Sequence, residues 1–380
     1  MAGATSDAFL HGEGIAVDLR DIEAELTRLW GPAAEQVGGP EIDQPSVTRV
    51  VLANLIVSGW GPSAPRSDAI LDALSSRYPC RAIVLRRSDE PQPRITAEVA
   101  AVCHLPAPGL PQVCSERIIL RAGPGTLDLV PAAVRSLLEA DLPTILWWTD
   151  DPRGAAPLFR ELADGATRLL VDLPDPDAEP AALRLALDPE AHPHAHDLAW
   201  FGITRWRELV TQLFDPPSSG ASLARIASVQ IRAQAPSQDR PARGACWLAS
   251  WMAGQLGWQP QHRYSPAPGR LEATFGSPSG EVAVEIFTEQ ATGYPSAHLT
   301  AVTLTTREPD GEGLFRLQRP EENFDEVQVD VTCPSHCTLP RRVLVPELDA
   351  PRRVAVALES SRNDPPFRRA LPIALWLLGG

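Results

Sequence analysis

The sequence contains no lysine, because all 34 of its basic residues are arginine. Three kinds of chemistry need a lysine side chain: a P-loop that binds phosphate through its lysine, a pyridoxal-phosphate Schiff base, and a lysine general base. We therefore exclude these three chemistries from the chain.

Cysteine is sparse, and the charge is strongly one-sided. Acidic residues outnumber basic ones by 48 to 34, and a formal net charge of -14 disfavours nucleic acid and anionic membranes as partners. The N-terminus has no basic segment followed by an apolar core, and no apolar run is long enough to cross a bilayer. Scattered cysteines in so large a chain are typical of mostly reduced, intracellular thiols, so we expect a cytoplasmic protein. They are Cys80, Cys103, Cys114, Cys246, Cys333 and Cys337.

The spacing of apolar residues predicts two kinds of sheet. Strands alternate with helices up to about residue 260, which favours a mainly parallel, covered sheet. Two strands without a helix between them, Arg81–Arg86 and Ile95–Val102, suggest an antiparallel insertion. After Arg263, short Gly/Pro turns join alternating strands, as in an antiparallel sheet. We therefore predict an α/β fold with a mainly parallel covered sheet in the N-terminal part, followed by a smaller α+β domain with an antiparallel sheet. The predicted parts are an N-terminal helix and linker (1–45), an α/β domain (46–260) and an α+β C-terminal domain (261–380).

Capping residues and apolar stripes define the predicted elements. Asp18 and Thr204 are expected to cap helices, Pro241 to start one, and Gly257 to end it. The other predicted strands of the first part are 49–58, 116–120, 144–148 and 168–172, and its helices are 18–30, 67–77, 127–140, 156–163 and 180–186. Later strands are predicted at 271–275, 282–288, 299–306, 314–318 and 327–331, and a last helix at 367–378, kinked by Pro372.

Aromatic and arginine side chains are the main candidates for partner binding. Trp147 and Trp148 end a predicted strand, so they point to opposite faces of the sheet. One can lie in the core, while the other must be covered by a helix, a ligand or a partner. Tryptophan and arginine are enriched at interface hot spots. The partner-binding candidates are therefore Trp147, Trp148, Trp200, Arg205, Trp206 and Arg207, although core packing explains Trp206 equally well.

A glycine-rich segment raises the alternative of a nucleotide-binding enzyme. Gly59-Trp60-Gly61-Pro62-Ser63-Ala64 follows a predicted strand and matches the dinucleotide pattern G-x-G-x-x-[G/A]. The next strand ends in Arg86 and Arg87, where NADP enzymes place a ligand for the 2′-phosphate. Pro62 opposes this interpretation because it removes a backbone donor from the loop. A plain strand-to-helix turn accounts for the pattern as well.

Other reactive residues form weaker patterns. His192, His194 and His196 could bind a metal, but their segment looks like an exposed connector. Cys333 and Cys337 are a candidate redox pair, although two incidental buried thiols explain them as well. Pairs drawn from Cys103, His104, Cys114 and Ser115, or from Asp150, Asp151 and Glu161, can act in catalysis only if the fold brings them together. We assign no catalytic residue, cofactor or metal site.

Several segments, taken together, resemble the glucose-6-phosphate dehydrogenase assembly protein family, OpcA. The order and spacing of these segments are similar to those of the family from about residue 18 to 260. The most specific features are the strand Leu142-Pro143 to Trp147-Trp148 and the helix Trp206-Arg207-Glu208-Leu209. The other segments are Val51–Val57, Tyr78–Leu85, Val113–Ile118, Arg168–Asp172, Asp197–Trp200, Gln212–Pro217 and Asn363–Leu371. The loop Gly59–Pro65 is shorter and richer in proline than in the family, and arginine replaces the family's lysines.

The resemblance implies a non-catalytic partner protein. Such a protein would bind glucose-6-phosphate dehydrogenase, favour its active form and thereby raise NADPH output of the oxidative pentose phosphate pathway. The dehydrogenase, and not this chain, would hold NADP. Redox control by cysteines occurs in some members, but Cys333 and Cys337 do not align clearly with those cysteines. The oligomeric state of the chain stays open.

Overall fold

The computed structural model describes residues 9–11, 15–35, 47–59, 64–75, 77–91, 93–104, 112–173, 179–291, 298–334 and 336–379. The chain divides into two compact units. The first consists of Met1–Leu173, Ala186–Ala195 and Ala350–Ser360, and the second of Pro174–Leu185, His196–Asp349 and Ser361–Gly380. The division differs from the predicted boundaries after residues 45 and 260, because the helices between residues 198 and 256 pack with the second sheet.

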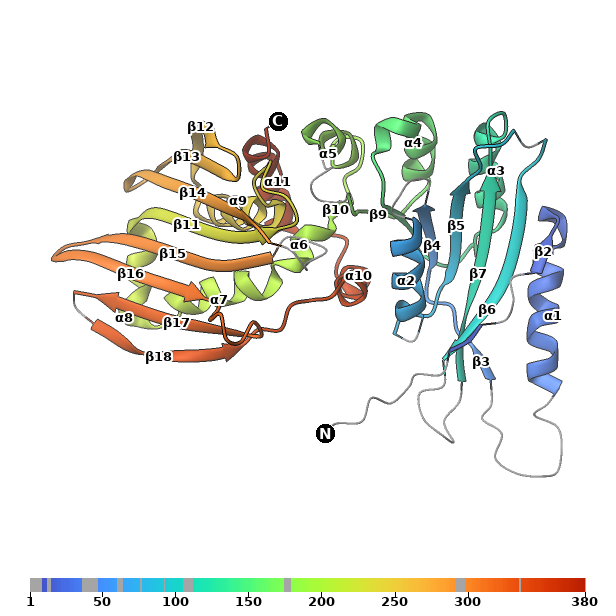
Figure 1. Cartoon of the computed structure of the whole chain (residues 1–380), viewed down its shortest axis with the longest axis horizontal. Helices are drawn as coiled ribbons and strands as arrows, with labels where there is room; N and C mark the ends of the chain where they lie inside the picture. The colour runs from blue at the N-terminus through green and yellow to red at the C-terminus, as the bar shows by residue number, and fades with distance from the viewer. Residues whose placement is uncertain are drawn as a thin grey trace, which may run out of the picture. The chain divides into compact units, whose positions relative to one another are not determined.

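The first unit is built on a sheet with a parallel centre (Figure 1). Its strand order is β1-β6-β7-β5-β4-β8-β9-β10, with β2 paired to β6 and β3 to β7, and the chain passes into the second unit within β10. The pairs β4–β5, β4–β8, β5–β7 and β8–β9 are parallel. The strands are β1 (Phe9–His11), β2 (Ile15–Val17), β3 (Val47–Arg49), β4 (Asn54–Gly59), β5 (Arg81–Arg87), β6 (Thr96–His104), β7 (Gln112–Ala122), β8 (Thr144–Trp148), β9 (Arg168–Val171) and β10 (Ala195–Asp197).

The predicted antiparallel insertion is present, with an arrangement that the sequence did not specify. Strand β7 lies between β5 and β6, parallel to the first and antiparallel to the second. The central strands β4 and β8 are buried along their whole lengths, as expected for parallel strands covered on both faces. The mainly parallel sheet predicted for the N-terminal part is therefore confirmed.

Helices cover both faces of this sheet. The ion pair between Glu23 and Arg81 fixes α1 on one face, while Leu71 and Leu74 of α2 lie with Ala82 on the other. Arg81 and Ala82 are neighbours in β5, so their side chains point to opposite faces. The helices of this unit are α1 (Ile22–Glu35), α2 (Ala64–Leu74), α3 (Val130–Ser136), α4 (Ala156–Asp164) and α10 (Ala350–Glu359).

The second unit contains a mostly antiparallel sheet, which confirms the predicted fold class of the C-terminal part. Its order is β12-β13-β14-β11-β15-β16-β17-β18. Strand β11 runs parallel to β14, and the other neighbouring strands in this sheet are antiparallel. The strands are β11 (Ile226–Ala235), β12 (Gln259–Ala267), β13 (Arg270–Ser277), β14 (Gly280–Gln290), β15 (His298–Glu308), β16 (Gly311–Gln318), β17 (Glu326–Cys333) and β18 (His336–Leu344).

Helices of the second unit pack on this sheet. α7 contacts β16, and α9 contacts β11, β14 and β15 as well as α11. They are α6 (Leu198–Gly202), α7 (Thr204–Phe214), α8 (Pro217–Gly220), α9 (Arg243–Leu256) and α11 (Pro365–Leu377), together with α5 (Pro180–Ala186), of which only Ala186 is assigned to the first unit. None of the helices in the described part of the chain is both long and apolar enough to span a membrane.

Two capping predictions are wrong and one is confirmed. The Asp18 side chain makes no capping hydrogen bond and pairs with Arg94 instead. The hydroxyl of Thr204 donates to the Phe201 carbonyl, so this residue begins α7 without capping it. Gly257 ends α9 in the left-handed conformation, at φ 67°, as glycine does at a helix C-terminus.

Candidate functional site

The carboxyl ends of β4 and β8 are the first place to look for a site. From β4 the chain continues to β5 and β7 on one side, and it later returns to the other side of β4 with β8. Open α/β sheets bind ligands at such a reversal of strand order. The glycine segment 59–64 follows β4, so the sequence placed the alternative nucleotide site here. Residues 60–63 of that segment lie outside the described residues.

Side chains of the protein itself connect the elements around this reversal. The Thr149 amide donates to the Ser58 hydroxyl at 2.9 Å, and the Thr149 hydroxyl donates to the Ser58 carbonyl at 2.5 Å. Arg66 of α2 forms an ion pair with Asp172, just after β9, at 3.2 Å. The two central strands are therefore linked directly at their carboxyl ends, and α2 is tied to the end of a third strand.

Arg86 occupies the space beside the first glycine of the nucleotide pattern. A Cβ atom added to Gly59 would lie 1.6 Å from Nη1 of Arg86 and 2.7 Å from its Cζ. The same guanidinium pairs with Asp68 of α2. Burial lowers the pKa of Arg86, and Asp68 opposes that effect. The cation that the sequence suggested for a 2′-phosphate thus has a carboxylate partner and lies against the backbone that a dinucleotide would approach. Arg87 is half-exposed and lies 3.8 Å from Asp89.

Trp147 and Trp148 are both fully buried, at 0% exposure. Trp148 meets Phe159 of α4 edge-on, with 5.0 Å between the ring centres. A helix therefore covers this tryptophan, which is one of the three coverings that the sequence allowed. Neither indole nitrogen has a hydrogen-bond partner among the described residues. Both residues therefore belong to the core, and neither offers an exposed side chain to a partner.

Trp200 and Trp206 are buried in the second unit, at 0% and 2% exposure. The Trp200 indole donates to Asp364 at 2.8 Å. Its ring lies 5.6 Å from that of Trp247, whose indole donates to Asp197 at 2.8 Å. Trp206 lies on the apolar stripe of α7, as core packing predicted. This buried network includes Asp197, Trp247 and Asp364, which the sequence did not single out, because they come from three separate segments.

The two arginines beside Trp206 have different environments. The Arg207 guanidinium lies over the Trp200 ring, 3.7 Å from its centre. Burial lowers the pKa of Arg207 to about 10, while Asp364 raises it. Arg205 is exposed and pairs with Glu208 one turn along the helix at 2.7 Å. Of the six predicted partner-binding residues, only Arg205 has an exposed side chain.

The histidine run does not converge on one point. His192 and His196 are buried, contrary to the exposed connector that was expected. His192 packs edge-on against Phe159, whereas His196 packs against Phe367. Burial lowers the pKa of His192. Within the described part of the chain, no three histidine, cysteine or acidic residues are grouped so that they could hold a metal ion.

The remaining carboxylates and cysteines are also dispersed. Asp151 caps a short helical turn and binds Arg153, which lowers the pKa of the carboxyl, and Glu161 pairs with Arg135. Cys114 is disulfide-bonded, so its thiolate cannot serve as a nucleophile. Cys103 lies opposite Cys114 in the β6–β7 ladder.

Cys333 is a buried free thiol, and its position in the ladder is opposite His336. Residue 335, between the two candidate redox cysteines, lies outside the described residues, as does the side chain of Cys337. The redox pair of Cys333 and Cys337 therefore stays a prediction.

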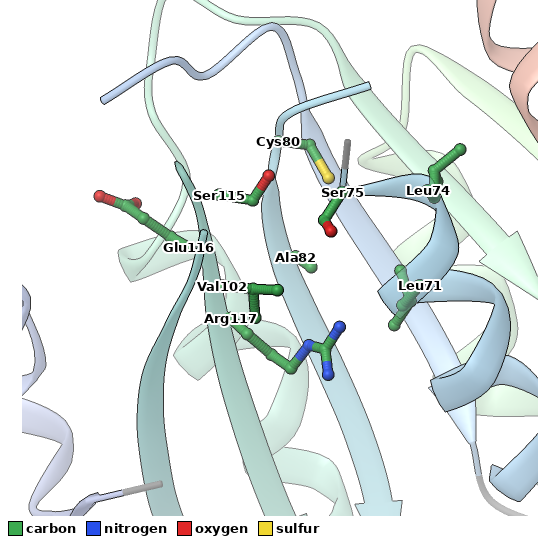
Figure 2. A pocket seen from close by; sticks show the side chains of 9 residues that line it. All are labelled: Leu71, Leu74, Ser75, Cys80, Ala82, Val102, Ser115, Glu116 and Arg117. Carbon is green, nitrogen blue, oxygen red and sulfur yellow. The ribbon is translucent and has the colours of Figure 1, made fainter. Parts of the chain in front are cut away.

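A small cavity lies between α2 and the sheet of the first unit. Figure 2 shows Cys80, Ser75, Ser115 and Arg117 around it, while Glu116 points away. Its volume of about 10 Å³ is enough for roughly one water molecule. Burial raises the pKa of Cys80 to about 12, so this thiol stays protonated at neutral pH. The cavity is too small for a substrate.

Two groups of known proteins are similar to this chain. The OxPP cycle protein OpcA of Synechococcus elongatus is 29% identical over 199 residues, which are 51% of this chain and 43% of that protein. OpcA of Synechocystis is 28% identical over 257 residues, or 64% of this chain and 52% of that protein. The chain thus spans about half the length of the curated relatives it matches.

Among solved structures, an oxidoreductase from Bacillus subtilis has a TM-score of 0.45 at 8% identity, covering 86% of this chain and 94% of that chain. A myo-inositol dehydrogenase from Lactobacillus casei has a TM-score of 0.42 at 13% identity, covering 87% of this chain and 93% of that chain.

Two family profiles match successive parts of the chain. Residues 71–186 match the glucose-6-phosphate dehydrogenase subunit N-terminal domain, and residues 193–371 match the C-terminal domain of the same subunit. Since the two matches together cover well over half of the sequence, the chain belongs to the OpcA family of glucose-6-phosphate dehydrogenase assembly proteins.

Proposed function

We propose that this protein is a non-catalytic assembly factor and allosteric effector of glucose-6-phosphate dehydrogenase. It binds the enzyme, favours its active form and thereby promotes NADPH production in the oxidative pentose phosphate pathway. The observation that carries the proposal is the family match over residues 71–186 and 193–371. The proposal implies a cytoplasmic protein that works beside its enzyme.

The contacts at the carboxyl ends of β4 and β8 support a non-catalytic role. A nucleotide enzyme of this sheet topology would leave open the space beside Gly59, whereas Arg86 lies there and pairs with Asp68. The hydrogen bonds between Ser58 and Thr149 link the two strand ends between which a dinucleotide would lie. For the alternative, an NADP-binding oxidoreductase using the segment 59–64, both sets of contacts would have to rearrange.

An effector works only through a difference in affinity between two states of its target. The chain must therefore bind active dehydrogenase more tightly than inactive dehydrogenase. A coupling free energy of about 1–3 kcal/mol gives a change of roughly 5- to 150-fold in the equilibrium between the states. No reactive group on the effector is needed for a change of this size.

The test measures NADPH production by glucose-6-phosphate dehydrogenase from the same organism, at low glucose 6-phosphate, with and without this protein. We expect a saturable, several-fold stimulation. Heat-denatured protein at the same concentration serves as the control for nonspecific protein effects. Folded protein that leaves the rate unchanged at every concentration would refute the proposal.

The oxidoreductase alternative has its own test. Tryptophan fluorescence of the isolated chain is followed during titration with NADPH, corrected for absorption by the nucleotide. We expect no saturable change, because Arg86 already has a partner. A saturable change that disappears in Arg86→Ala would instead support nucleotide binding at this sheet edge.

A further inference from the structure

The two most exposed large apolar side chains in the described residues lie on one edge strand. Leu339 is 91% exposed and Leu344 is 73% exposed, and both belong to β18, the last strand in the order of the second sheet. Single exposed leucines are common on protein surfaces. Leu339 differs from such cases because it borders a groove.

The groove lies between the end of α7 and the last two strands of the sheet. Its volume is about 560 Å³. Leu213 and Asp215 line it on the helix side, and Val329, Val331, Leu339 and Arg341 line it on the sheet side. The apolar residues make it suitable for a large apolar side chain, and one charged residue of each sign lies at its margin. Leu344 is outside it, because this residue pairs with Glu326 and so faces away from Val329 and Val331.

Strand β18 is poorly suited to pairing with a second copy of itself. Pro340 has no N–H to donate, and the ladder with β17 is irregular between Val329 and Val331. In an antiparallel pair centred on Pro340, the two copies of Arg341 would be diagonal neighbours, within reach of each other's long side chains. Proline, bulges and charges are the features by which natural edge strands avoid such pairing.

The charges near Leu339 indicate what the groove accepts. Arg342 is already paired with Glu322 at 3.2 Å and Glu326 at 3.4 Å. Arg341 is exposed, and no ion pair or side-chain hydrogen bond joins it to another described residue. A carboxylate on an incoming segment could therefore pair with Arg341 without displacing a described partner. Leu339 would pack against an apolar side chain beside that carboxylate.

We propose that this groove binds a segment of the partner enzyme in which a large apolar side chain stands next to a carboxylate. The inference rests on the proposed function for the identity of the partner, while the groove itself determines the chemistry of the segment. The apolar side chain lies over the groove wall formed by Leu213 and Val331, Leu339 packs against it, and Arg341 pairs with the carboxylate. Fully desolvated apolar contacts of this kind dominate interface energies.

The test compares three variants of the full-length chain for binding to glucose-6-phosphate dehydrogenase from the same organism, by isothermal titration calorimetry. We expect Leu339→Asp to weaken binding at least tenfold, as truncation of a hot-spot residue does. Arg341→Glu should weaken binding as well and reverse its salt dependence, because attraction becomes repulsion. Leu344→Asp is the matched control, on the same strand but outside the groove, and should leave the dissociation constant within about twofold. Circular dichroism and melting temperature verify that each variant is folded.

The outcomes separate this inference from the function on which it rests. If the wild-type chain does not bind the dehydrogenase, the proposed function fails, and the partner named here fails with it. If the wild-type chain binds but Leu339→Asp binds equally well, the groove is not the interface and the proposed function stands. If Leu344→Asp weakened binding as much as Leu339→Asp, the proposal that the groove is the interface would also be refuted. Sedimentation velocity provides a further check: a wild-type dimer that Leu339→Asp converts to monomer would identify a second copy as the occupant.

Discussion

Replacement of Arg81 should destabilise the first unit, because this side chain is the centre of a buried network of ion pairs. Its side chain is 2% exposed. Its Nε donates to Glu116 at 2.7 Å, and the carboxylate of Glu116 is fully buried. Its terminal nitrogens contact Glu23 at 2.7 Å, Glu139 at 3.0 Å and the Leu137 carbonyl at 2.9 Å. One guanidinium therefore holds three carboxylates that come from α1, β7 and the connection before β8.

The expected loss of unfolding free energy depends on how deeply each carboxylate partner of Arg81 is buried. Arg81→Met leaves Glu116 buried without its cation, and breaking a buried pair from one side is destabilising by about 3–5 kcal/mol. The carboxylates of Glu23 and Glu139 are 58% and 39% exposed, so Glu23→Gln and Glu139→Gln should each lower the free energy of unfolding by about 1 kcal/mol or less. The two surface variants are matched controls, because they change the same guanidinium's contacts.

Urea unfolding of the full-length variants, followed by tryptophan fluorescence, measures these differences. The double variant Arg81→Met/Glu116→Leu should recover most of the lost stability, since apolar groups of similar volume replace buried ion pairs with little loss. The reasoning is refuted if Arg81→Met is no less stable than Glu23→Gln. It is also refuted if the double variant is no more stable than Arg81→Met.

Three further predictions concern the candidate residues. Trp148→Ala should destabilise the chain by about 3–5 kcal/mol, because the indole is fully buried. The control Arg205→Ala changes an exposed side chain and should leave the melting temperature nearly unchanged. Equal melting temperatures for the two variants would contradict the assignment of Trp148 to the core. Gly59→Ala should force Arg86 from its position and lower the melting temperature, and the loss should be smaller when Arg86→Ala is already present. Burial lowers the pKa of His192, so its folded state binds fewer protons than the unfolded chain near that pKa, and stability should fall as the pH drops from 7 to 5. His192→Phe should fall less over the same range, and parallel curves for the two proteins would contradict this cause.

Elements with strong local signals were predicted closely. Strand β8 was predicted at its observed bounds, because Pro143 precedes it and an acidic turn follows Trp148. Helix α5 was likewise predicted as Pro180–Ala186. The stripe of α7, from Trp206 to Phe214, was correctly assigned to the core. In each case, residues that are close together in the sequence determine the element.

Elements that depend on distant partners were missed. Strand β11 lies in the middle of the second sheet, yet its pairing partners β14 and β15 come later in the chain. From Val229 to Ala235 its buried residues alternate with less buried ones, although its ladder with β15 has two register shifts. The sequence therefore carries a period-2 signal at Val229, Ile231, Ala233 and Ala235 that could have identified this strand. Because β11 was missed, the helices before and after it were grouped with the first domain, and the predicted boundary came at residue 260.

Burial of the candidate tryptophans could not be predicted from residue type alone. Tryptophan is favoured both in cores and at interface hot spots. Trp200 lies on a helix of only five residues, too short to establish an apolar face by periodicity. Its burial depends on Asp364, 164 residues later, which accepts its indole hydrogen bond. Leu339, the most exposed apolar residue among those described, was not singled out, because a leucine between a threonine and a proline carries no chemical motif.

The Leu339→Asp variant can also show whether the groove contributes only affinity for the dehydrogenase or also the coupling that favours its active form. A contact that is the same in the active and inactive dehydrogenase contributes affinity but no coupling, since only the difference between states shifts their equilibrium. If the groove makes such a uniform contact, Leu339→Asp should raise the concentration of effector needed for half-maximal stimulation and leave the maximal stimulation unchanged. If the groove senses the active state, the maximal stimulation itself should fall, because a saturating effector then shifts the equilibrium less. Saturation curves of NADPH production for the wild type and this variant therefore distinguish an anchoring contact from the one that carries the switch.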